Sequence, residues 1–325
     1  MEFNRDLVDS AAIFPGRAAS ATSASGAALS YSDRRRLFLV LMTIPAVAYV
    51  IAVGVWPLTK GIWYSLYDYS LLRPARAHFV GLGNYADVLT DPVTRQAFFN
   101  TAIFTVCAVA VELLLGFAIA LALWRDDRFN RMCLALILIP VTITPLVVGL
   151  IFRALLMPEY GLIGYYLAEF GLSNPHGLFA EGPSALATLI FIDIWEWTPL
   201  VALILLAGLK ALPGDILEAA RVDGASATQR LRMIVIPLMA PTIVLALTLR
   251  MIDAFRIFDT VYVTTGGGPG NATNTLMLHA VKQGLEFFNI GLASAIANVT
   301  LICIAVIATG FVVLFRQADR RAHGR

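Results

Sequence analysis

Long apolar runs alternate with short polar segments along most of the 325-residue chain. A helix needs about 20 apolar residues to cross the ~30 Å hydrocarbon core of a bilayer, and runs of this length recur along the sequence. The pattern therefore predicts an all-α membrane protein with six spanning helices. Their approximate ranges are 37–57, 98–124, 132–156, 185–209, 234–257 and 290–315.

Composition supports a membrane domain over residues 34–325. Hydrophobic residues make up 58% of the chain and charged residues only 14%, whereas soluble domains are about 25% charged. Residues 1–33 are rich in Ala and Ser without hydrophobic periodicity, which predicts a flexible tail. A cleaved signal peptide is the competing interpretation. The first apolar run disfavours it, because the run is about a full span long and no small-residue cleavage site follows.

The distribution of positive charge predicts the orientation in the membrane. An even number of spans places both termini on one side. If that side is the cytoplasm, the inside segments hold 16 Lys and Arg residues and the outside loops hold 5. Basic residues favour the cytoplasmic side. We therefore expect both termini and the loop 210–233 to be cytoplasmic, and the long loops 58–97, 157–184 and 258–289 to face outward.

The cytoplasmic loop carries helix-start signals in both of its halves. Asp215 with Glu218, and Ser226 with Gln229, have the spacing of a capping box. Gly224 lies between the two pairs, where a left-handed residue would end a helix. The spacing predicts a short helix, a sharp turn and a second helix that continues into the fifth span. Such an elbow is either a docking device for a partner or an ordinary amphipathic connector, and spacing alone favours neither.

Patterns for catalysis and metal binding are absent from the sequence. The three cysteines lie in apolar runs, which indicates neither a disulfide nor a metal site, and the four histidines have no metal-ligand spacing. The glycine-rich run 264–270 lacks the Lys-Ser/Thr pair of a phosphate-binding loop and lies in an outside loop. We therefore expect no catalytic residue, no metal and no cofactor in this chain, and no ATP hydrolysis by it.

Eight ionisable residues lie in or beside the spans, where an unpaired charge costs several kcal/mol. They are Glu112, Arg153, Asp193, Glu196, Arg250, Asp253, Arg256 and Asp259. The last four recur every three residues, which predicts that they lie along one drifting helix face. They form either a self-neutralising ladder that joins helices or part of a water-filled path whose side chains bind substrate hydroxyls. Glu112 is expected to pair across helices.

Part of the loop and the fifth span form a dense motif. Its residues are Glu218-Ala219-Ala220, Asp223-Gly224-Ala225, Ile234, Pro237 and Pro241. This motif resembles the EAA loop of the permease subunits of binding-protein-dependent ABC importers. Leu231 replaces a usual aromatic residue and Leu217 a frequent Tyr, and both keep an apolar contact. In such permeases the loop is the coupling helix that fits a cleft on the cytoplasmic ATPase. The resemblance thus implies an ATPase-coupling role for Glu218, Ala219, Ala220, Asp223, Gly224 and Ala225.

Further matches extend the resemblance over most of residues 35–320. They are residues 80–85, 100–101, Pro145 with 149–151, 161–163, 195–199 and 266–269. The runs 195–199 and 266–269 are similar to the maltose- and glycerol-phosphate-type permeases in particular. Those permeases import carbohydrates and polyols, and they hold the sugar between the fourth and fifth spans. The resemblance implies a substrate path at Asp193, Glu196, Trp197 and Arg250, with Trp195 or Trp197 packing on the sugar. Asp253 and Arg256 are candidates for the same path, although the ladder interpretation stays open for them.

The resemblance also implies the assembly. It implies a type I ABC importer permease fold in a bacterial plasma (inner) membrane and a heterodimer with a second homologous permease. Two cytoplasmic ATPase subunits would bind ATP and Mg, and an extracytoplasmic binding protein would deliver the substrate. No nucleic-acid partner is expected, because the basic residues are spread along the chain.

Two other classes of membrane protein compete with this interpretation. A proton-coupled secondary transporter would explain buried carboxylates without an elbow, but internal inverted repeats are its usual signature and none is visible. An intramembrane aspartyl protease would use Asp193 and Asp253, yet neither lies in a Gly-x-Gly-Asp setting.

Overall fold

A computed structural model of the chain describes residues 31–323. Most of the predicted tail, residues 1–30, therefore lies outside the described residues. The chain divides into two compact units, Met1–Trp56 and Pro57–Arg325. The described part of the first unit is helical: α1 covers Tyr31–Val50 and the π-helical segment η1 covers Ile51–Val55.

The second unit starts at Pro57, the second residue of α2 (Trp56–Ser65), and continues with a small two-stranded sheet. Strands β1 (Tyr67–Asp68) and β2 (His78–Phe79) pair antiparallel on either side of the 3-10 turn η2 (Pro74–Arg76). Helix α3 (Gly83–Thr90) follows. The buried side chain of Asn84 ties these pieces together, because its amide donates to the carbonyls of Ser65 and Tyr67 at 2.8 and 2.9 Å.

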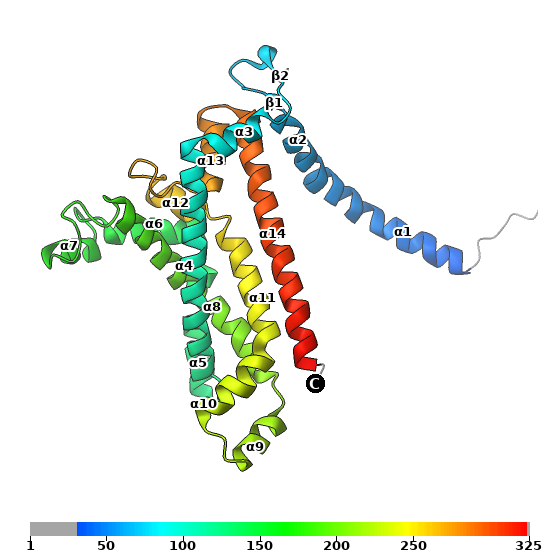
Figure 1. Ribbon diagram of the computed structural model, residues 1–325, viewed down its shortest axis with the longest axis vertical. Coiled ribbons are helices and arrows are strands. Elements are labelled where there is room, and N and C mark those ends of the chain that lie inside the picture. The colour runs from blue at the N-terminus through cyan, green and yellow to red at the C-terminus, as the bar shows by residue number, and fades with distance from the viewer. Residues whose placement is uncertain (1–30, 324–325) are drawn as a thin grey trace, which may run out of the picture. The chain divides into compact units, whose positions relative to one another are not determined.

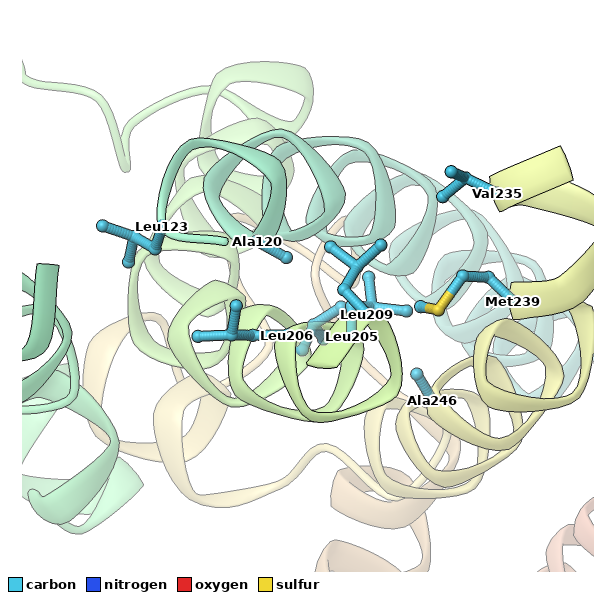
Figure 2. Close-up of a cluster of buried hydrophobic side chains, with 9 residues drawn as sticks. Ala120, Leu123, Leu205, Leu206, Leu209, Val235, Met239 and Ala246 are labelled. Carbon is cyan, nitrogen blue, oxygen red and sulfur yellow. The ribbon is translucent and has the colours of Figure 1, made fainter. Parts of the chain in front are cut away.

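Four long helices form the body of the second unit. They are α4 (Pro92–Ala122), α8 (Gly182–Lys210), α11 (Ile236–Ala254) and α14 (Ile290–His323). Helix α4 packs along α8, and α11 packs against α4, α8 and α14. Figure 2 shows one of the resulting apolar clusters, in which Leu205 and Leu209 of α8 face Ala120 of α4, with Met239 and Ala246 of α11 beside them.

By length and composition, the described residues contain five helices able to cross a membrane. Their ranges are Arg35–Ser65, Pro92–Ala122, Gly182–Lys210, Ala227–Ala254 and Ile290–Val313. These correspond to the predicted first, second, fourth, fifth and sixth spans. The fifth ends at Ala254, three residues before the predicted limit.

The expectation of a continuous third helix over 132–156 is wrong. The segment forms α5 (Arg128–Ile137), the 3-10 turn η3 (Pro140–Thr142) and α6 (Pro145–Leu156). Pro145 causes the break before α6, because proline lacks the amide hydrogen of the helical ladder and forces the residue before it out of the α region. Pro140 opens the 3-10 turn η3. Thr144, directly before Pro145, has the extended ψ of 141° that this rule requires.

Short helices occupy the two ends of the second unit (Figure 1). At one end lie α9 (Gly214–Val222), α10 (Ala227–Arg230) and the π-helical η4 (Leu231–Val235), which leads into α11. At the other end, near α3, lies α13 (Leu276–Val281), followed by η5 (Lys282–Glu286). Helices α7 (Leu162–Glu169) and α12 (Asp259–Thr264) accompany α6. The last turn of α14 lies toward the end that holds α9 and α10.

Candidate functional site

A cavity of about 320 Å³ opens where α8, the end of α11 and the start of α12 meet. Its polar wall consists of Asp193, Trp197, Asp253, Arg256 and Asp259, and Pro145 and Met277 contribute apolar surface. Helix α11 stops at Ala254 and α12 starts at Asp259, so the irregular segment between them bends the chain around this cavity. The cavity therefore lies between the predicted fourth and fifth spans.

Arg250 of α11 is the centre of a buried ion-pair network beside the cavity. Its Nε donates to Glu112 Oε2 at 2.6 Å and its Nη2 to Glu112 Oε1 at 2.9 Å. The same Nη2 donates to Asp193 Oδ2, and Nη1 donates to Asp253 Oδ2, both at 2.8 Å. Arg250 thereby joins α4, α8 and α11 through a single guanidinium group.

The geometry explains why these charges tolerate burial. The side chains of Arg250 and Glu112 are 2% and 0% exposed, so their desolvation is costly unless charge-assisted hydrogen bonds replace water. The planar guanidinium meets Glu112 with two parallel N–H bonds, which is the strongest arrangement available to this pair. The indole of Trp197 covers the guanidinium at 4.9 Å from Cζ to the ring centroid, adding a cation–π contact. Glu112 thus pairs across helices, as expected.

The predicted path residues divide into two groups. Asp193, Trp197, Asp253 and Arg256 line the cavity, whereas Arg250 is held behind them in the network. Glu196 is also buried, and its Oε1 has no hydrogen-bond partner among the described residues. Of the two candidate tryptophans only Trp197 borders this cavity.

Trp195 lies elsewhere on α8, with its ring centroid 5.2 Å from that of Phe152 in an edge-to-face contact. Trp195 and Phe191 line a separate, mainly apolar cavity. The Phe191 ring also makes an edge-to-face contact with Phe152.

The prediction that four charges share one continuous helix face is wrong. The helix ends at Ala254, after Arg250 and Asp253, while Arg256 lies in the irregular segment and Asp259 opens the next helix. The Arg256 guanidinium still reaches back to Asp253 Oδ1 at 3.1 Å. The result is a branched cluster around Arg250 and not a linear ladder.

The elbow at the other end of the unit has the turn that the sequence predicts. Gly224 has a φ of +78°, Ala225 N–H donates to the Ala220 carbonyl at 2.9 Å, and Gly224 N–H donates to the Arg221 carbonyl at 3.1 Å. This pair of bonds is a Schellman motif. The capping box of Ser226 with Gln229 is also present, with both reciprocal hydrogen bonds formed.

The capping box predicted for Asp215 with Glu218 does not form. Helix α9 begins at Gly214, and Pro213 occupies the N-cap position without a side-chain cap bond. Asp215 therefore lies inside the first turn, where its charge complements the helix dipole but its carboxylate caps nothing.

The side chains of the elbow point in two directions. Glu218, Ala219, Asp223 and Gly224 are exposed, whereas Ala220 is buried and Ala225 half-buried. Leu217 and Leu231, at the two positions that depart from the EAA pattern, pack against the apolar cluster of Figure 2. The elbow thus presents one polar face to the outside of the unit and attaches to the helices through leucines.

A second polar cluster was not predicted from the sequence. The Thr94 hydroxyl donates to Asp91 Oδ2 at 2.7 Å and contacts His279 Nε2 at 3.1 Å, and His279 Nδ1 lies 3.4 Å from Asn274 Nδ2. Asp91, Asn274 and His279 border a cavity of about 600 Å³ that Lys282 also lines. Burial lowers the pKa of His279, although the Asp91 carboxylate opposes the shift. No spacing in the sequence relates His279 to Thr94, since 185 residues separate them.

Comparison with known proteins identifies the family. The family model described as "Binding-protein-dependent transport system inner membrane component" matches residues 112–323. The chain belongs to this family. It is a component of a binding-protein-dependent importer and a multi-pass membrane protein, and the expectation of a transport subunit instead of an enzyme is confirmed.

Relatives match over most of their length. The trehalose transport system permease protein SugA of Mycobacterium tuberculosis is 37% identical, over 88% of this chain and 91% of that protein. The trehalose/maltose transport system permease protein MalF of Thermococcus litoralis is 34% identical, over 86% and 92%. The sn-glycerol-3-phosphate transport system permease protein UgpA of Agrobacterium fabrum is 30% identical, over 87% and 95%. The predicted resemblance to carbohydrate-group ABC importer permeases is thereby confirmed.

A solved structure shares the fold. One chain of a bacterial ABC transporter involved in the import of the acidic polysaccharide alginate aligns with a TM-score of 0.75 at 17% identity, covering 87% of this chain and 96% of that chain. The importer permease fold predicted from the sequence is therefore confirmed, with the third span in two pieces.

Proposed function

We propose that this permease subunit imports a carbohydrate or polyol through the cavity bordered by Asp193, Trp197 and Asp253. The observation that carries the proposal is the polar cavity of about 320 Å³ between two long helices, in a chain whose relatives are permeases for trehalose, maltose and glycerol phosphate. Its volume lies in the range of small-ligand sites, about 300–1,000 Å³.

The chemistry of the cavity wall suits a hydroxylated ligand. Carboxylates of Asp193, Asp253 and Asp259 accept hydrogen bonds from hydroxyl groups, and Trp197 offers an apolar ring surface beside them. Arg250 acts as a positioning residue, because it fixes the carboxylates of Asp193 and Asp253 at 2.8 Å on either side of its guanidinium. The site thus combines acceptors with one aromatic wall.

The elbow is proposed as the coupling element. Glu218 and Ala219 lie exposed on α9, and Asp223 lies exposed at its C-cap. The Schellman turn and the capping box stiffen this elbow, and η4 joins it directly to α11. ATP and Mg would be bound by two ATPase subunits that dock here and transmit closure to the helices, so that the path alternates between inward and outward access. Ala220, Gly224 and Ala225 shape the turn that the ATPase contacts.

The proposed assembly contains a second, homologous permease, because one subunit walls only one side of a path. An extracytoplasmic binding protein delivers the substrate, in keeping with the family description. Both termini and the elbow face the cytoplasm of a bacterial cell. The bias of 16 inside to 5 outside basic residues supports this orientation.

Purification of the intact complex from its native membrane tests the proposal. We expect an ATPase to co-purify and carbohydrate uptake in proteoliposomes to require ATP, the binding protein and the absence of vanadate. Glu218→Arg should abolish uptake while the complex stays assembled, whereas Glu169→Arg, an exposed charge reversal on α7, should leave it intact. Uptake driven by a proton gradient without ATP would support the secondary transporter instead.

A further inference from the structure

We propose that the cavity admits uncharged carbohydrates and rejects anionic ones, and that Asp259 sets this selection. The inference rests on the proposed function and deepens it. It follows from the balance of charges around the cavity and from which of them are already engaged.

Carboxylates outnumber guanidinium groups at this site. Five acidic side chains lie in or directly beside the cavity wall: Glu112, Asp193, Glu196, Asp253 and Asp259. Two basic side chains, Arg250 and Arg256, face them. Among residues 31–323, no group of three or more His, Cys, Asp or Glu is arranged to hold a metal ion, so the protein's own groups set this balance.

Both cations already have acidic partners within the protein. A guanidinium has five N–H groups, and Arg250 directs four bonds to Glu112, Asp193 and Asp253. It is also 2% exposed and covered by Trp197, which keeps an incoming anion from reaching it. Arg256 is exposed but donates to Asp253 at 3.1 Å. The positive charge of each guanidinium is therefore already paired with at least one carboxylate of the protein.

The ionisable groups without an ion-pair partner at the site are acidic. Within the described part of the chain, no ion pair engages Asp259 or Glu196. Asp259 is exposed and lines the cavity, whereas Glu196 is buried with one carboxyl oxygen lacking a hydrogen-bond partner. Like charges repel strongly away from bulk water, so an anionic ligand is disfavoured here. Hydroxyl groups, by contrast, supply the donors that these oxygens lack.

The proposed rejection of anionic ligands separates the relatives by the charge of the substrates that their names give. Trehalose and maltose are uncharged, whereas glycerol phosphate and the acidic polysaccharide alginate carry negative charge. The charge balance favours the first pair as the kind of substrate that this chain carries.

Equilibrium dialysis of the assembled complex without its binding protein tests the inference. The probes are radiolabelled trehalose, together with glucose and glucuronate as a pair that differs by one carboxylate. We expect the neutral probes to bind about tenfold or more tightly than glucuronate. Asp259→Lys should reduce that ratio by about tenfold and Asp259→Asn by less. Glu169→Lys, the same change at an exposed site away from the cavity, should leave the ratio unchanged.

Glucuronate binding as tight as glucose, absence of binding by both neutral probes, or equal effects of the Asp259 and Glu169 variants would overturn the inference. Uptake with the binding protein separates this failure from failure of the proposed function. A complex that takes up an acidic sugar still imports carbohydrate and refutes only the charge selection. A complex with no ATP-dependent carbohydrate uptake refutes the function itself.

Discussion

Single side chains decide the chemistry of this protein where charge meets apolar packing. Arg250 is the clearest case, since one buried guanidinium holds carboxylates from α4 and α8 as well as Asp253 of its own helix. A paired, fully hydrogen-bonded cluster of this kind is tolerated in the interior, but an unpaired remnant is not.

Removing Arg250 should therefore destabilise the fold strongly. Arg250→Met leaves Glu112 and Asp193 buried without a cation, and the expected cost is about 3–5 kcal/mol. Arg256→Met is the matched control, because Arg256 is 60% exposed and its pair with Asp253 should contribute no more than about 1 kcal/mol. Unfolding of the two variants in detergent, followed by circular dichroism, measures the difference. Similar losses in both variants would contradict the central role of Arg250.

The His279 cluster predicts a stability that depends on pH. The Thr94 hydroxyl donates to Asp91, so His279 Nε2–H must donate to Thr94, and Nδ1 accepts from the Asn274 amide. A protonated ring would place a second N–H against that amide donor. Burial lowers the pKa of His279 in the folded state, below its ordinary value near 6.5. Asp91 opposes this shift and Lys282 supports it.

The sign of the effect follows from proton linkage. Between the lowered folded pKa and the ordinary pKa of His279, the unfolded chain binds a proton that the folded chain does not. Stability is therefore full above about pH 6.5 and falls as pH drops through that window. Melting temperatures at about pH 7.5 and pH 5.5 should differ less in His279→Asn than in the unaltered protein. The same change at the exposed His78 is the matched control.

At the scale of elements, the elbow shows that local signals specify a turn well. Gly224 supplies the left-handed residue, and Ser226 with Gln229 starts the next helix, so both features depend on residues within a few positions of each other. The Asp215 cap failed because the helix begins at Gly214, two residues before the start that the spacing suggested, with Pro213 at the N-cap.

Gly224 should be intolerant of any side chain for conformational reasons alone. A Cβ at Gly224 would meet no atom within 4 Å. The substitution Gly224→Ala therefore measures only the conformational cost of a side chain at a φ of +78°. The expected loss is about 1–2 kcal/mol. Gly214→Ala is the control, since Gly214 is helical and equally uncrowded, and should gain up to about 1 kcal/mol. Thermal unfolding of both variants decides, and equal behaviour would count against the turn.

At the scale of the whole molecule, the packing of α4 against α8 depends on small residues at the contact. A Cβ built on Gly116 of α4 would lie 2.8 Å from Val201 Cγ1 and 3.1 Å from the Ala202 nitrogen on α8. Glycine at this position lets the two backbones approach closely, as small residues commonly do between membrane helices.

Gly116→Ala should therefore separate these helices and cost about 1–3 kcal/mol. Gly310→Ala on α14 is the matched change at a helical glycine with open space around it, and should be neutral or stabilising. Unfolding in detergent compares the two variants. A neutral Gly116 variant would show that the interface adapts without strain.

The sequence by itself determined the class of the protein, the positions of five long spans, the elbow and its glycine turn. These features depend on hydrophobic length and on residues close together in the chain, which a single sequence contains in full. The motif residues identified the family for the same reason. Even the break before Pro145 follows from local chemistry, although the apolar length of 132–156 concealed it.

Only the tertiary structure decided how the charged residues are used. The sequence placed Glu112, Asp193 and Arg250 in neighbouring spans, but the bidentate pair and the branched cluster arise from contacts between residues 57 to 138 positions apart. Helix α11 ends at Ala254, so Asp253, Arg256 and Asp259 line a cavity and do not continue along one helix. This helix end also depends on the tertiary structure. Pairing across helices depends on how the helices rotate and pack, and no local pattern records that.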